Sequence, residues 1–296
     1  MMILPASRVL RAWIALCLLA LVACSTQAGS LFWKAEKNGQ VVWLLGSVHV
    51  GSTAFYPLPP AVEKAFAASK SLMVEADVSS PAAQKQLTQF IRLPKGQSLD
   101  SVLGQDLAKR LLIRVNDPQL SDAVLRTFQP WFLCTAIEMQ IAAKLGYDPE
   151  QGIDLHYLKM AREQRKPVVE LESVAAQGRM LSGLTQAETR HFVSETLSQL
   201  EDQSAARQFA DLVDAWRQGD ELAMDRLLRE SFDDSALSRA LMGKILYGRN
   251  PGMARGIAAQ SRQQSPIMVV VGAGHLVGQG SVIQLLKQDG FTVSKW

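Results

Sequence analysis

The amino-acid sequence predicts an α/β fold in which a central, mostly parallel sheet is formed by the N- and C-terminal segments, with a large helical segment in the middle. Short apolar stretches typical of buried strands occur near both ends, at residues 41–46, 71–75 and 267–271. Between them, residues 81–166 and 174–263 show the apolar spacing of amphipathic helices. Because the strands are too apolar to face water, we expect them to share one sheet.

The N-terminal part of this sheet is predicted in most detail. Residues 31–36 and 41–46 flank an Asn38-Gly39 pair at the expected turn position, which indicates a β-hairpin. A helix opened by Pro59-Pro60 follows, and residues 71–75 form the next strand. This order of strand, helix and strand predicts a crossover connection and parallel pairing.

The rest of the chain contains further boundaries. Asp148-Pro149-Glu150-Gln151 is a favourable helix start, because Asp can cap and Pro fits the first turn. Residues 167–171 are predicted to be another buried strand, and Gly219-Asp220 interrupts the second helical region. After the strand at 267–271, we expect a helix at 281–287 and a last strand at 291–293.

Composition limits the class of protein. The 296 residues are 48% hydrophobic and 20% charged, which suits a large core and excludes a disordered chain, and we expect one domain over residues 31–296. The formal net charge of +3 includes Arg8 and Arg11, which lie in a segment that we expect to be removed. The remaining charge of about +1 indicates no nucleic-acid partner.

The first residues have the pattern of a secretory signal. A basic start ends at Arg11, and an apolar run too short to span a bilayer comfortably leads to small residues before Cys24. Leu21-Val22-Ala23-Cys24 resembles the bacterial lipobox, in which the cysteine is acylated and becomes the new N-terminus. We therefore expect a signal peptide at 1–23, lipidation at Cys24 and a linker at 24–30; the alternative is an ordinary signal peptide with a chance cysteine.

The residue after the lipobox bears on localisation. By resemblance to bacterial lipoproteins, Ser25 in place of Asp indicates the periplasmic side of the outer membrane, with membrane contact through the N-terminal lipid only. Removal of Cys17 and acylation of Cys24 would leave Cys134 without a disulfide partner in the chain. Cys134 lies in an apolar helical stretch and is expected to be buried.

Four polar side chains follow predicted strands at their carboxyl ends: His49, Glu75, Glu172 and His275. In an open parallel sheet, these ends meet at the edge where ligands bind. Two of the four belong to the same motif, Gly-x-x-His, at Gly46–His49 and Gly272–His275. Glycine allows a close backbone approach at such a turn, and the histidine can then return to the crevice.

Two histidines and a carboxylate are typical ligands of a divalent transition metal. We expect His49, Glu75 and His275 to bind Zn²⁺ or Mn²⁺, with Glu172 as an acid–base partner. The structural alternative is that the two carboxylates accept hydrogen bonds from loop amides while the histidines pack over the sheet edge. The other histidines, His156 and His191, lie on predicted helices, where exposure or helix packing accounts for them.

The chain also carries a series of short motifs in this order: Gly46-Ser47-Val48-His49, Glu75-Ala76-Asp77, Pro130-Trp131, Gly152-Ile153-Asp154, Leu171-Glu172, Gln177, Gly219-Asp220, Arg249-Asn250 and Val271-Gly272-Ala273-Gly274-His275-Leu276-Val277-Gly278. In order and spacing they resemble the TraB/GumN family, over essentially all of residues 31–296. Through this family the chain also resembles the TIKI metalloproteases and, more distantly, erythromycin esterase and ChaN-like haem-binding proteins.

The resemblance implies an α/β core with a helical segment between its halves. It implies that His49, Glu75 and His275 are metal ligands or acid–base groups. It also implies that Arg249 and Asn250 belong to the site, where they would bind a carboxylate or an oxyanion. From the residues alone, Arg249-Asn250 before a proline is only a helix break.

The resulting hypothesis is a lipid-anchored, metal-dependent hydrolase, with peptide bonds as the expected target. The expected partner is a peptide or small-molecule substrate. One alternative is a non-catalytic lipoprotein that binds haem or a metal through its histidines. The other is a metal-independent esterase, in which one histidine activates water and Glu75 orients it.

Overall fold

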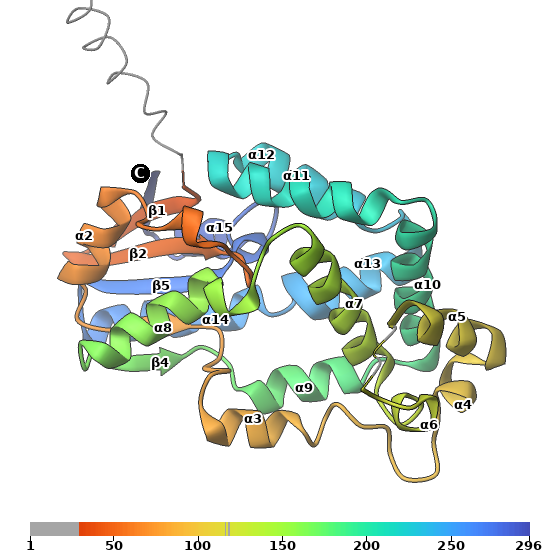
Figure 1. Cartoon of the computed structure of the whole chain (residues 1–296). Helices are drawn as coiled ribbons and strands as arrows, with labels where there is room; N and C mark the ends of the chain where they lie inside the picture. The colour runs from red at the N-terminus through yellow and green to blue at the C-terminus, as the bar shows by residue number, and fades with distance from the viewer. Residues whose placement is uncertain (1–29, 116, 118) are drawn as a thin grey trace, which may run out of the picture.

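The computed structural model describes residues 30–115, 117 and 119–296 (Figure 1). The predicted signal peptide, Cys24 and the linker up to residue 29 lie outside the described residues. Within the described part of the chain, no helix has the length and apolar character needed to cross a membrane.

A six-stranded sheet has the order β4-β3-β5-β2-β1-β6. Three neighbouring pairs are parallel, β4 with β3, β3 with β5 and β5 with β2, whereas β1 pairs antiparallel with β2 and β6. The predicted α/β fold with a mostly parallel sheet from both ends of the chain is therefore confirmed. The strands are β1 (Phe32–Lys37), β2 (Gln40–Ser47), β3 (Leu72–Val74), β4 (Val168–Glu170), β5 (Ile267–Gly272) and β6 (Thr292–Lys295).

The C-terminal strand β5 lies between two strands from the N-terminal part. Val269 pairs with Leu44 of β2 on one side and with Met73 of β3 on the other. The side chains from Ile267 to Val271 are almost fully buried, as expected for a strand covered on both faces. The two ends of the chain thus form one hydrophobic core.

The hairpin at the start of the domain forms at the predicted turn. Asn38 and Gly39 both have positive φ, 50° and 78°, the conformation that a two-residue hairpin turn requires and that Asn-Gly adopts readily. Strand β1 then pairs with β2 through Lys37 and Gln40 next to this turn.

Helices cover the two faces of the sheet. Right-handed crossovers place α2 (Pro60–Ala68) and α8 (Ile153–Glu163) on one face, where Phe66 contacts Tyr157 at a ring distance of 4.9 Å. The connections into and out of β5 run in the opposite direction across the sheet. They therefore place α14 (Asn250–Gln263) and α15 (Val282–Gln288) on the other face.

Most of the remaining helices extend from the sheet as a lobe (Figure 1). Leucines from the α4–α5 region pack with side chains of α7 and α10 to form a second hydrophobic core, which includes the fully buried Cys134. Two helices differ, because α11 and α12 pack Trp216 and Met224 into the core of the sheet. The remaining helices are α3 (Pro81–Leu87), α4 (Leu99–Leu103), α5 (Gln105–Val115), α6 (Asp122–Leu125), α7 (Pro130–Lys144), α9 (Val174–Ser182), α10 (Gln186–Glu201), α11 (Ser204–Gln218), α12 (Glu221–Glu230), α13 (Ala236–Met242) and the π-helical turn η3 (Gly243–Tyr247).

Two boundaries differ from the prediction. Asp148 caps a 3₁₀ turn, Pro149–Gln151, and α8 begins only at Ile153, because Gly152 packs against the backbone of His49 and the Ile153 amide donates to the Val48 carbonyl. Strand β4 was predicted to be buried but lies at the edge of the sheet, where its side chains are half-buried or exposed.

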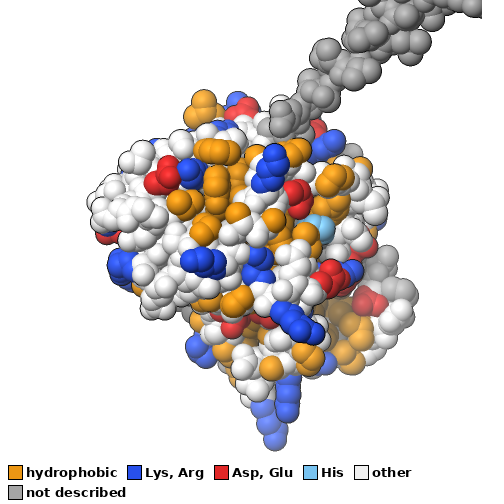
Figure 2. All heavy atoms as spheres, turned by 90° about the vertical axis from the view of Figure 1, so that its left-hand side faces the viewer, with side chains coloured by type: hydrophobic (Ala, Val, Ile, Leu, Met, Phe, Trp, Pro, Cys, Tyr) orange, Lys and Arg blue, Asp and Glu red, His pale blue; other side chains and the backbone are white. Residues whose placement is uncertain are grey.

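The face on the left of Figure 1 is shown from the front in Figure 2. Among the residues coloured there, Lys and Arg side chains are scattered with Asp and Glu side chains between hydrophobic and uncharged ones. This mixed surface agrees with the small net charge of the chain.

We predict that a chain ending at residue 263, which lacks β5 and β6, will not unfold cooperatively, because the core strands β2 and β3 pair with each other only through β5. The cooperativity of thermal unfolding is measured by circular dichroism during heating. A matched chain ending at residue 290 loses only β6 and should keep a cooperative transition at lower temperature. A cooperative transition in the shorter chain would contradict the shared core.

Candidate active site

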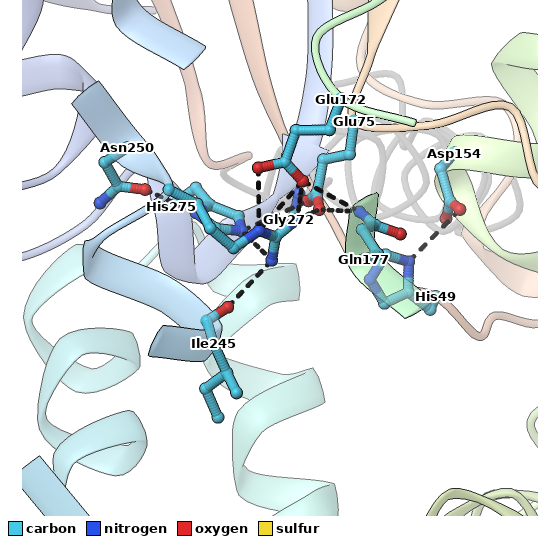
Figure 3. A network of polar contacts seen from close by, with 10 residues as sticks. His49, Glu75, Asp154, Glu172, Gln177, Ile245, Asn250, Gly272 and His275 are labelled. Carbon is cyan, nitrogen blue, oxygen red and sulfur yellow. Dashed lines mark hydrogen bonds and ion pairs between the residues drawn. The ribbon is translucent and has the colours of Figure 1, made fainter. Parts of the chain in front are cut away.

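The four polar residues predicted at the carboxyl ends of strands do lie at one edge of the sheet (Figure 3). His49 follows β2, Glu75 follows β3, and His275 follows β5. Glu172 comes shortly after β4, and its amide donates to the carbonyl of Glu75, which holds the two acidic segments side by side.

Arg249 connects the two carboxylates. Its Nη2 atom donates to Glu75 Oε2 and to Glu172 Oε2, each at 2.6 Å, and its Nε atom donates to both oxygens of Glu172 at 3.0–3.1 Å. The Nη1 atom donates to the Ile245 carbonyl and lies 3.2 Å from His275 Nε2. Every N–H group of Arg249 therefore has an acceptor. The three ion-paired side chains are only 13–18% exposed.

Glu75 is the carboxylate with the most partners. Its Oε1 accepts a hydrogen bond from the Gly272 amide at 2.7 Å and lies 3.6 Å from His275 Nε2, while Gln177 Nε2 bridges Glu75 and Glu172 at 3.3 Å. Burial alone would raise the pKa of Glu75. The positive partners around it and the Gly272 amide outweigh burial and lower that pKa to about 2, so the carboxylate is ionised at neutral pH.

His275 is held from behind by Asn250. The Asn250 amide nitrogen donates to the Gly280 carbonyl, so its oxygen faces His275 Nδ1 at 2.6 Å and requires the proton there. Burial, assisted by the charge of Arg249, lowers the pKa of His275 to about 4. The imidazole is therefore neutral at pH 7, with the lone pair of Nε2 directed toward the site. Asn250 itself is fully buried.

His49 has an analogous partner in Asp154, the second residue of α8. The Nδ1 atom lies 3.3 Å from Asp154 Oδ2, and this carboxylate raises the pKa of His49 to about 9. Unlike His275, the His49 side chain is 66% exposed, and it contributes to the lining of a cavity. Because Nδ1 faces Asp154, Nε2 remains free to face the other site residues (Figure 3).

Gly272 is the point around which these groups meet. A Cβ atom at this position would lie 3.1 Å from Glu75 Oε1, 3.7 Å from the His275 ring and 3.9 Å from His49 Nε2. Glycine thus keeps open a small space surrounded by two imidazoles and a carboxylate. This donor set suits a divalent transition metal, although Arg249 Nη1 would have to move away from His275 Nε2 to free that lone pair.

A tighter group of possible metal ligands lies elsewhere. Within the described residues, His191, Glu195 and Asp233 offer ligand atoms that are all within 4.8 Å of one another. His191 Nε2 already contacts the Ser238 hydroxyl at 2.7 Å. His49, Glu75 and His275 do not meet that distance limit, so their joint ligation requires their side chains to close on the ion.

A cavity of about 520 Å³ opens between the sheet edge and the helical lobe. Its lining includes His49, Glu75, Arg249 and His275, together with residues of α7, α10, α11, α12 and η3. A substrate in the cavity would therefore reach this polar cluster. Ser47 also lines the cavity, and its nearly buried hydroxyl has no hydrogen-bond partner among the described residues.

Sequence reasoning did not assign Asp154, Gln177 or the Gly272 amide to the site. Asp154 stands three residues after a short turn, and nothing in its local pattern indicates a histidine partner 105 positions earlier. Gln177 and Asp154 do occur among the motifs that resemble the family, which is the one signal that could have found them.

We predict that Arg249→Ala lowers the free energy of unfolding at pH 7 by about 3 kcal/mol, because it leaves two mostly buried carboxylates side by side without the guanidinium that they share. Chemical denaturation of the native chain and of the variant at pH 7 measures this difference in the free energy of unfolding. Arg226→Ala, which removes an exposed guanidinium 3.8 Å from Glu230, is the matched control and should cost less than about 0.5 kcal/mol.

The pH dependence of stability should also become weaker. In the native chain, the low pKa of Glu75 stabilises the fold above pH 4.5, and this contribution is lost as the pH falls toward 2. Without the charge of Arg249 the pKa of Glu75 rises toward its unfolded value, so the variant should lose less stability than the native chain as the pH falls from 4.5 toward 2. Equal losses for Arg249→Ala and Arg226→Ala would contradict this account.

The chain has relatives among known proteins, and no solved structure matches it. It is 29% identical to the uncharacterized protein YbaP of Escherichia coli over 82% of this chain and 87% of that protein. It is 23% identical to the metalloprotease TIKI2 of Danio rerio and 24% identical to that of Xenopus tropicalis, over 85% and 89% of this chain. It spans only 57% and 59% of those two proteins. A model of the TraB/PrgY/gumN family matches residues 31–295, and the chain therefore belongs to that family.

Proposed function

We propose that the chain is a metal-dependent hydrolase that cleaves peptide bonds. The observation that carries this proposal is the cluster around Gly272, where His49, Glu75 and His275 face one small space at the end of a cavity. The names of the TIKI relatives support metalloprotease chemistry at low identity.

The residues present fit a divalent metal. An oxygen atom faces Nδ1 of each histidine: Asp154 Oδ2 faces His49, and Asn250 Oδ1 faces His275. This arrangement leaves Nε2 of each ring as the ligand atom, as in metal sites with oriented imidazoles. A bound Zn²⁺ or Mn²⁺ would lower the pKa of water and polarise a substrate carbonyl. Since His49 is protonated up to about pH 9 without metal, binding must release a proton.

The other polar residues position groups or move protons. Arg249 uses all of its donors on the protein, so its role in this arrangement is to hold Glu75 and Glu172 in place. Glu172 Oε1 has one hydrogen bond, from Arg249 Nε at 3.1 Å, and keeps a lone pair free to accept a proton. We assign Glu172 as the acid–base group. The buried Asn250 positions His275.

We also propose that the enzyme is tethered by lipid at Cys24 on the periplasmic side of the outer membrane, since a basic start, a short apolar run and a lipobox occur in the required order. The substrate would then be a periplasmic peptide or small molecule. Intact mass of detergent-extracted protein tests the anchor: a lipid-bearing chain beginning at Cys24 is expected, and a lipid-free N-terminus at another residue contradicts it.

A second candidate is a metal-independent esterase. The His49–Asp154 pair is what favours it, because a carboxylate on Nδ1 orients the imidazole. Since Asp154 also raises the pKa of His49 to about 9, His49 would act as a general base only at alkaline pH. In this version Asp154 takes the orienting role that the sequence suggested for Glu75. Activity that persists in the presence of a chelator would support it.

We predict that His49→Ala and His275→Ala each abolish bound metal and peptide hydrolysis. Elemental analysis of the purified chain and cleavage of a fluorogenic peptide library measure the two effects. His191→Ala is the matched control, because it removes the histidine of the other group of possible ligands, His191, Glu195 and Asp233. Loss of metal in His191→Ala alone would place the ion in that group and overturn the proposed site.

A further inference from the structure

One hydroxyl group that lines the cavity has no partner. Among the described residues, three side chains with hydroxyl groups contribute to the lining, namely Ser47, Thr196 and Ser231. Thr196 donates to the Phe192 carbonyl and Ser231 to the Leu227 carbonyl, each four residues earlier in the chain. Ser47 is only 3% exposed, and its Oγ atom has no hydrogen-bond partner among the described residues. Its hydroxyl is therefore free for a group that enters the cavity.

A buried hydroxyl without a partner is unfavourable for the fold by itself. Burial takes the hydroxyl out of water, and its lost hydrogen bonds cost free energy that an alanine would not lose. Among the described residues, three other buried side-chain atoms lack a partner, in Ser71, Trp131 and Asp154, and none of these residues lines the cavity. Within this part of the chain, only Ser47 combines an unpartnered hydroxyl with access to the cavity, which points to a ligand as its partner.

The sheet directs Ser47 toward the polar cluster. Ser47 is the last residue of β2, and its Cα pairs with that of Gly272 on the parallel strand β5. Paired residues on neighbouring strands direct their side chains to the same face of a sheet. A Cβ atom at Gly272 would point toward Glu75 Oε1 and the His275 ring. The Ser47 side chain therefore faces the same small space as these groups.

The backbone just before Ser47 is held in place from two sides. The Gly46 amide donates to the Leu31 carbonyl at 2.7 Å, and the Gly46 carbonyl accepts a hydrogen bond from Trp216 Nε1 at 2.8 Å. The hydroxyl is thus carried by a fixed strand end. A donor held in this way suits the stabilisation of charge that develops during a reaction, because it need not reorganise.

Other donors near the proposed metal ligands are used within the protein. Every N–H group of Arg249 has an acceptor. The fully buried Asn250 donates to the Gly280 carbonyl, and Nδ1 of His275 donates to Asn250. The Ser47 hydroxyl is therefore the neutral side-chain donor that remains available to a substrate beside this cluster.

We propose that the Ser47 hydroxyl donates a hydrogen bond to the carbonyl oxygen of the peptide bond that is cleaved. This inference rests on the proposed hydrolase function. When water adds to the carbonyl carbon, the π electrons of the carbonyl move to its oxygen, and one proton of the water passes to Glu172. The electron pair then returns, the C–N bond breaks, and the amine takes the proton from Glu172. Ser47 keeps its own proton and stabilises the negative charge on the oxygen.

The test uses phenylphosphonate, whose tetrahedral, anionic oxygens resemble that intermediate, and calorimetry on the purified full-length chain in detergent. Ser47→Ala should bind this probe about tenfold more weakly than the native chain, because a hydrogen bond to a charged oxygen is lost. Ser71→Ala is the matched control, since it removes a buried, unpartnered hydroxyl outside the cavity lining, and it should keep the native affinity. Neither variant should have a lower thermal midpoint, because no hydrogen bond within the protein is lost.

A kinetic measurement separates this role from ground-state binding. On a peptide that the native chain cleaves, Ser47→Ala should lower kcat about 100-fold and change KM little, because the oxygen is fully charged only after water has added. Ser71→Ala should change neither constant.

Three results would overturn the inference. The first is native affinity for phenylphosphonate in Ser47→Ala, which would leave water as the partner of the hydroxyl, and the second is no binding of the probe by the native chain. The third is a covalent adduct on Ser47 after treatment with a fluorophosphonate, which would make Ser47 a nucleophile. The binding measurement needs no hydrolysis. It therefore remains informative if the hydrolase function fails, and its failure leaves the metal and cleavage results of the histidine variants unaffected.

Discussion

The interaction on which the site depends is the contact of one guanidinium with two carboxylates. Arg249 stands between η3 and α14, far along the chain from Glu75 and Glu172, and its Nη2 lies 2.6 Å from each of them. Two mostly buried carboxylates so close together would repel each other without it. The ion pairs therefore join the end of the helical lobe to the sheet edge, and they contribute, with the two histidines and the Gly272 amide, to keeping Glu75 ionised.

The two Gly-x-x-His segments use their glycines in related ways. A side chain at Gly46 would meet Ala273 at 3.1 Å, and one at Gly272 would meet Glu75 at the same distance. Gly46 thus lets the first motif lie against the second, and Gly272 lets the second motif lie against Glu75.

The two histidines differ in environment. His275 is buried and neutral, and Asn250 contacts its Nδ1, whereas His49 is exposed to the cavity and pairs with Asp154.

The sheet could be predicted from the sequence because its signals are local. The Asn38-Gly39 turn, the apolar run at 267–271 and the placement of polar residues after strands need no knowledge of distant contacts. The start of α8 and the edge position of β4 could not, since tertiary contacts decide them: Gly152 packs on His49, and no strand follows β4 in the sheet order. The cavity beside the site was also out of reach, because helices from distant parts of the chain, α7, α10, α11 and α12, build it together.

The central claim is that His49, Glu75 and His275 close on one metal ion at Gly272. A crystal structure of the chain grown with Zn²⁺, with anomalous data collected at the zinc edge, tests it most directly. The account predicts a peak at about 2.0–2.1 Å from Nε2 of both histidines, with Glu75 as a third ligand. A peak bound only by His191, Glu195 and Asp233, with none beside Gly272, would contradict it.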